Sequence, residues 1–83
     1  MPVHKAQHLK EYKPLLGLLR EMREEAGLSQ RKLGAILGKV HNHVYYCETG
    51  GRRVDPAEFL QWAEACAVDP VVAWRRYLKL VGR

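Results

Sequence analysis

The sequence lacks any segment that could cross a membrane or direct the chain through one. No stretch approaches the roughly 18 consecutive apolar residues of a membrane span. The N-terminal residues MPVHKAQHLKEYK contain no apolar core of the kind found in signal peptides. We therefore expect a cytoplasmic protein without a membrane partner.

The residue patterns of enzymes and metalloproteins are also missing. There is no glycine-rich nucleotide-binding loop and no nucleophile with a plausible base beside it. Cys47 and Cys66 lack the Cys-x-x-Cys spacing of a zinc site, and the spacing of His41 and His43 does not place them on one helix face. We expect no enzymatic activity, no metal site and no cofactor. The two cysteines are expected to be reduced and buried, with a disulfide as the alternative.

Candidate β-strands, internal repeats and low-complexity segments are absent as well. The apolar residues recur at helical spacing, and 83 residues suffice for one domain with a small core. We expect an all-α fold of five helices. Its predicted parts are an N-terminal arm (residues 1–12), a central helical domain (13–70) and a C-terminal helix that could form a dimer contact (71–83).

Proline and aspartate mark the starts of three of these helices. Pro14 suits a first helical turn, and the apolar residues after it continue at helical spacing until Gly27. Asp55 and Asp69 are each followed by proline, which is the pattern of an N-cap with proline at the first helical position. Glu58, three residues after Asp55, predicts a capping box.

Basic residues are more frequent than acidic ones. Fourteen Lys and Arg residues against nine Asp and Glu residues give a net charge of +5 and a pI near 9.5. This balance favours polyanionic partners, nucleic acid first and an acidic membrane surface second.

Residues 28–53 predict two short helices joined by a tight turn, which is the layout of a helix-turn-helix. Ser29 is a good N-cap for the first helix, and Gly38 can adopt the left-handed conformation that ends it. The second helix is expected from about His41 to Thr49.

The second helix of this pair has two different faces. At 100° per residue, one side contains Val40, Val44, Cys47 and Glu48, the other contains Asn42, Tyr45, Tyr46 and Thr49, and His41 and His43 lie at the boundary. The second side has no acidic residue, and basic residues precede and follow it in the sequence. Such a face suits a polyanion.

This stretch resembles the lambda-repressor-like (Xre) DNA-binding domains. Their commonest pattern is matched here by Leu28-Ser29-Gln30 at the start, Leu37-Gly38 at the turn, Glu48 at the end of the second helix, and the basic loop Gly50-Gly51-Arg52-Arg53. The resemblance covers roughly residues 15–70. It implies a domain that binds double-stranded DNA and inserts the second helix into the major groove.

The resemblance also implies roles for single residues. The family's base-reading positions fall on His41, Asn42 and Tyr46, with Tyr45 beside them. The amide of Asn42 is the most specific of these groups because it can pair with adenine. Gln30 is expected to bind a phosphate at the positive end of its helix. The other expected contacts with the DNA backbone are Arg31, Lys32, Lys39, His43, Arg52 and Arg53.

Glu48 falls on the apolar side of its helix, where an unpaired carboxylate would be costly. Arg23 lies at the edge of the apolar face of the helix predicted between Pro14 and Gly27. A guanidinium can bind a carboxylate through two hydrogen bonds. Many members of the family pair an arginine and a glutamate at these positions, so we expect an Arg23–Glu48 ion pair. The alternative is that Glu48 reaches solvent.

The histidines suggest a pH effect on DNA binding. If His41 or His43 approaches phosphates, affinity should rise as the pH falls through roughly 6.5, because the complex favours the protonated form.

Two functions remain open. The first is a sequence-specific transcriptional regulator, with repression the expected role, that binds paired half-sites as a homodimer. Trp74, Leu78 and Val81 of the last helix are candidates for the dimer contact, or else this helix only covers the core. The second is an antitoxin or phage accessory protein that binds a protein partner through Tyr45 and Tyr46 or through the last helix.

Overall fold

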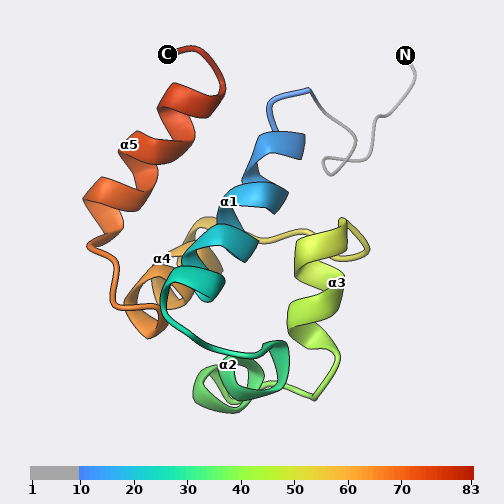
Figure 1. Cartoon of the computed structure of the whole chain (residues 1–83). Helices are drawn as coiled ribbons and strands as arrows, with labels where there is room; N and C mark the ends of the chain where they lie inside the picture. Colours follow the sequence, from blue (N-terminus) through green and yellow to red (C-terminus); the bar gives the residue numbers. More distant parts are fainter. Residues whose placement is uncertain (1–9) are drawn as a thin grey trace.

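The computed structural model describes residues 10–83, which form five α-helices and connecting loops without a strand (Figure 1). The helices are α1 (Lys13–Glu25), α2 (Gln30–Leu37), α3 (His43–Thr49), α4 (Pro56–Ala65) and α5 (Pro70–Leu80). The prediction of an all-α, five-helix fold is confirmed. Most of the predicted N-terminal arm, residues 1–9, lies outside the described residues. Among the helices described, none is long and apolar enough to cross a membrane.

The core is built around α1, which contacts α3 on one side and α5 on the other (Figure 1). Leu18, Leu19 and Met22 of α1 are almost completely buried. The indole Nε1 of Trp62 in α4 donates a hydrogen bond to the backbone oxygen of Leu19 at 3.0 Å, so its one polar group is satisfied. The rest of the core cluster is Leu33, Val44, Cys47, Val54, Ala63, Cys66 and Ala73.

Three helices begin at the predicted caps. The hydroxyl of Ser29 accepts the backbone N–H of Lys32 at 3.0 Å. Asp55 accepts the N–H of Glu58 at 2.8 Å, and Glu58 accepts the N–H of Asp55 at 3.1 Å, which completes the capping box of α4. The carboxylate of Asp69 caps α5 by accepting the backbone N–H groups of Val71 at 2.8 Å and Val72 at 3.3 Å. These local hydrogen bonds explain why the starts of α2, α4 and α5 agree with the sequence pattern.

The start of α3 differs from the prediction. The helix begins at His43, two residues later than expected, and Asn42 at its N-cap position makes no side-chain capping hydrogen bond. Val40 therefore precedes the helix and is 70% exposed, whereas the sequence pattern placed it on the inward side. The helical angular count fails there because Val40 lies in the loop between α2 and α3 rather than in a helix.

One arginine of α5 forms ion pairs with two glutamates of α1. Arg76 donates to Glu25 through both terminal nitrogens, at 2.9 and 2.8 Å, and to Glu21 at 2.7 Å. These hydrogen bonds raise the pKa of Arg76 and lower that of Glu25. The ion pairs are exposed, so their main effect is to orient α5 along α1.

Candidate nucleic-acid interface

α2 and α3 form the helix-turn-helix at one end of the molecule. α2 ends at Gly38, whose φ of 69° lies in the left-handed region, and the backbone N–H of Lys39 returns to the oxygen of Gly34 at 2.9 Å. Glycine adopts this conformation without a steric penalty, so the chain can turn sharply into residues 39–42. Neither helix has an acidic residue in its own first turn.

The two faces of α3 have different environments. Val44 and Cys47 are fully buried, and only 3% of the Glu48 side chain is exposed. On the opposite face, Tyr45 is 50% exposed and Tyr46 is 45% exposed, with their rings in an edge-to-face contact at 5.4 Å. The buried face anchors α3, and the exposed face presents two large amphipathic side chains to solvent.

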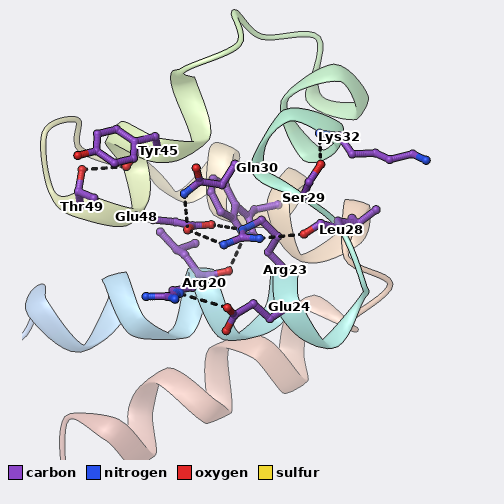
Figure 2. A network of polar contacts seen from close by, with 12 residues as sticks. Arg20, Arg23, Glu24, Leu28, Ser29, Gln30, Lys32, Tyr45, Glu48 and Thr49 are labelled. Atoms are coloured by element: carbon purple, nitrogen blue, oxygen red, sulfur yellow. Dashed lines mark hydrogen bonds and ion pairs between the residues drawn. The ribbon is translucent and has the colours of Figure 1, made fainter.

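Glu48 is the hub of a network that joins three helices (Figure 2). Arg23 of α1 donates to it through Nε at 2.6 Å and through Nη2 at 3.1 Å, and Gln30 of α2 donates through Nε2 at 3.1 Å. Arg23 also donates to the backbone oxygen of Leu28 at 2.9 Å. The hydrogen bonds to Glu48 raise the pKa of Arg23. The expected Arg23–Glu48 ion pair is therefore present and bidentate. The burial of the Glu48 side chain excludes the alternative in which it reaches solvent.

Gln30, the predicted phosphate ligand, belongs to this network. It lies at the first position of α2, half-buried, with its amide nitrogen directed at Glu48. An amide NH₂ group has two N–H donors, so one remains for another acceptor. A phosphate contact by Gln30 remains compatible with this geometry and would link DNA to the anchor of α3.

His43 is not on the surface. Only 7% of the residue is exposed, and its Nε2 lies 3.5 Å from the Sγ of Cys47. Burial lowers the pKa of His43; the positive charges of Arg52 and Lys39 act in the same direction, and Glu58 opposes them. The burial of His43 argues against the predicted contact with the DNA backbone, because the imidazole would have to leave its place beside Cys47 to reach a phosphate.

Two of the four predicted base-reading residues lie in the turn before α3. His41 is exposed and Asn42 is half-buried, and both precede the first helical residue. They are therefore neighbours of the exposed α3 face rather than part of it. Tyr45 and Tyr46 are the base-reading candidates on the helix itself.

The predicted backbone-binding cations fall into two groups. Arg31, Lys32, Lys39 and Arg53 are exposed. Arg52 is exposed too, but its Nη1 donates to Glu58 at 2.8 Å and to the backbone oxygen of Arg53 at 2.9 Å. A phosphate would have to compete with Glu58 for Arg52, so we expect the other four cations to contribute more.

The two thiols are placed as expected from the sequence. Cys47 and Cys66 are buried and free, and burial raises the pKa of each thiol. Within residues 10–83, no group of three or more His, Cys, Asp or Glu residues could hold a metal ion.

A second surface lies away from α3 and was not predicted. A hollow of about 480 Å³, here called the aromatic hollow, is lined by residues that include Tyr12, Phe59, Leu60, Trp74 and Tyr77. Trp74 is 52% exposed and stacks edge-on against Phe59 at 6.4 Å. The clue in the sequence is the spacing of aromatic residues in α4 and α5, but only the tertiary structure brings them to one place.

The helix-turn-helix arrangement agrees with comparisons to known proteins. Residues 15–75 match the family described as "Helix-turn-helix domain". The chain is also similar to the solved structure of an "XRE-family like protein from Pseudomonas syringae pv. tomato str. DC3000", with 33% identity and a TM-score of 0.78, over 84% of this chain and 85% of that chain. No curated protein matches the chain. The protein belongs to the helix-turn-helix domain family and has the Xre type of this fold.

Proposed function

We propose that this protein is a sequence-specific DNA-binding regulator of transcription. The observation that carries the proposal is the division of α3 into a face anchored by Glu48 and a face with two exposed tyrosines and no acidic side chain. The major groove of B-DNA is wide enough to admit a helix. An α3 held in this way can enter the groove as a rigid element.

The roles of the residues follow from where they lie. Asn42 and His41 lie in the turn that leads into α3, and an asparagine amide can pair with the N6 and N7 atoms of adenine. Tyr46 and Tyr45 lie on the exposed face, where a ring can contact a thymine methyl group or a sugar. Phosphates are bound by Gln30, Arg31, Lys32, Lys39 and Arg53, with Arg52 as a further contact once it leaves Glu58.

We further propose that the protein binds as a homodimer and represses. One small domain contacts a single half-site, so two copies are needed to read paired half-sites about one helical turn apart. The exposed side chain of Trp74 on α5 supports a contact between two copies there. Repression needs no further activity, because a protein bound across a promoter excludes other proteins from it.

Selection from a random duplex library tests the proposal. The wild type and an Asn42→Ala, Tyr46→Ala double variant are compared at about 150 mM salt, with Gln61→Ala, at an exposed position of α4 that does not line the aromatic hollow, as the matched surface control. We expect paired half-sites to be enriched by the wild type and by Gln61→Ala but not by the double variant. Absence of enrichment with a folded wild type would contradict sequence-specific binding.

A second candidate function is protein binding through the aromatic hollow, as in an antitoxin or a phage accessory protein. The hollow and the exposed Trp74 beside it favour this candidate. Salt separates the two functions. Binding to DNA through six or more phosphates weakens by about a thousandfold between 50 and 200 mM salt. Binding through an apolar hollow changes little over the same range.

A further inference from the structure

Two adjacent glycines follow α3, and they differ in conformation. Gly50 has a φ of 84°, in the left-handed region that ends the helix, so its backbone alone explains the glycine. Gly51 is not among the residues with positive φ. Its backbone conformation is accessible to other amino acids, so the absence of a side chain at Gly51 needs another explanation.

The explanation lies in the ring of Tyr46. A Cβ atom on Gly51 would lie 2.9 Å from Cδ1 of Tyr46 and 3.7 Å from its Cβ and Cγ, and the first distance is too short for two carbon atoms. The backbone N–H of Arg52 also donates to the oxygen of Tyr46 at 3.2 Å, which holds the loop against the helix. The Tyr46 ring thus lies directly against the backbone of Gly51.

The position of this ring bears on recognition, because Tyr46 is 45% exposed on the face of α3 that we assign to DNA. The ring is partly exposed and does not belong to the hydrophobic core cluster. A methyl group at residue 51 would therefore turn the ring without opening the core. The substitution would therefore change the shape of the DNA-binding face and leave the stability of the fold largely unchanged.

We propose that Gly51 is a positioning residue for base recognition, which sets the orientation of the Tyr46 ring by having no side chain. The inference rests on the proposed function and adds a specificity determinant in a loop that would otherwise serve only as a turn and a source of cations. The part of the DNA that Gly51 would help to recognise is the nucleotide that Tyr46 contacts in the major groove, through a thymine methyl group or a sugar.

A double-mutant cycle tests the proposal. Gly51→Ala, Tyr46→Ala and the double variant are measured against the selected site and against the same site with single base-pair changes. Gly51→Ala should lower affinity about tenfold, the scale of one specific base contact, and flatten the preference at one position of each half-site. In the Tyr46→Ala background, Gly51→Ala should have no further effect.

Arg53→Ala is the matched control in the same loop. It removes an exposed cation, so affinity should fall uniformly for all sequences, with no change in preference. If Gly51→Ala behaves like Arg53→Ala, or weakens binding equally with and without the Tyr46 ring, the positioning role is refuted. Thermal unfolding of each variant shows that it is folded at the temperature of the assay.

A measurement without DNA separates this inference from the proposed function. In the wild type, NMR should show nuclear Overhauser contacts between the Tyr46 ring protons and the Hα protons of Gly51, and Gly51→Ala should shift the ring resonances. Missing contacts in the wild type would overturn the positioning role even if DNA binds. Present contacts in a protein that selects no sequence would instead refute the proposed function, and with it a recognition role for Gly51.

Discussion

α3 and α4 are adjacent in the chain, yet different kinds of interaction hold them. α4 has ten residues, a complete capping box and a proline in its first turn, and all of these stabilising contacts are local. α3 has seven residues and no side-chain N-cap. Its polar anchors are Arg23 and Gln30, which are 25 and 18 residues away from Glu48 in the sequence. α4 is defined by local signals, and α3 by tertiary contacts.

This difference matters for function. A seven-residue helix is unstable in isolation, so α3 needs anchors from the rest of the molecule. All of those anchors act on one face, through Val44, Cys47 and Glu48. The side chains of the opposite face are not part of the core, so they are available for contacts with DNA. The predictions below test this division of labour, from the largest expected effect to the smallest.

Removal of the Glu48 charge should have the largest effect. Glu48→Gln leaves the guanidinium of Arg23 without its counter-charge at a site where 11% of the Arg23 side chain is exposed. We expect the free energy of unfolding to fall by about 3 kcal/mol, measured by urea denaturation. The matched control is Glu24→Gln, which breaks the exposed Arg20–Glu24 pair and should cost about 0.5 kcal/mol or less. Equal losses in the two variants would mean that the buried pair does not anchor α3.

Acidification should destabilise the protein through His43. Because the folded-state pKa of His43 is lowered, the unfolded chain takes up a proton at a higher pH than the folded chain does. The stability that depends on neutral His43 is therefore complete above pH about 6.5 and is lost as the pH falls toward the folded-state pKa. For one group the slope cannot exceed about 1.4 kcal/mol per pH unit.

Urea denaturation between pH 7.5 and 5.5 measures this effect. His43→Gln should have a shallower slope than the wild type. A wild-type slope that persists in His43→Gln would assign the effect to another group. Acidification is thus expected to lower the folding stability through the buried His43. The sequence alone had suggested a different effect, a rise in DNA affinity through a His43 on the surface.

Loss of the α4 cap should have a moderate effect. Asp55→Ala removes the acceptor for the N–H of Glu58, and we expect a loss of about 1 kcal/mol in thermal or urea unfolding. Asp55→Asn keeps an acceptor and serves as the control, with a much smaller loss. Base preference should be unchanged in both variants, since α4 takes no part in reading DNA. An altered preference in Asp55→Ala would show that the two regions are coupled.

A gain in stability is expected at Gly34 in α2. A Cβ atom there would lie 3.7 Å from the oxygen of Val40 and 3.8 Å from Cγ2 of Val44, which are ordinary contact distances. Gly34→Ala should therefore add about 0.5–1 kcal/mol through helix propensity alone. Gly38→Ala, at a φ of 69°, should instead lower stability. A loss at Gly34 would show that α2 and α3 approach more closely than these distances indicate.

The features that could be predicted from the sequence are those with local causes. Ser29, Gly38 and Asp55 act on residues within four positions of themselves, so their roles can be recognised in the linear sequence. The Arg23–Glu48 pair spans 25 residues, and the family resemblance was needed to support it.

The remaining features depend on tertiary structure. α3 has no local cap, so its start was placed two residues too early, and Val40 and His43 were assigned to the wrong environments. The aromatic hollow arises only when the aromatic residues of α4 and α5 are brought together by packing. The contact between Gly51 and the Tyr46 ring is local, but it depends on the conformation of the loop after α3, which the residue pattern does not specify.

An NMR titration of the protein with its selected duplex compares the two regions most directly. We predict that the largest chemical-shift changes occur at Tyr45, Tyr46 and Thr49 and in the first turn of α2, with small changes at Phe59 and Trp74. This result would establish the exposed face of α3 as the DNA-binding surface. Changes centred on Phe59 and Trp74, with α3 unperturbed, would contradict that assignment and make the aromatic hollow the principal binding site.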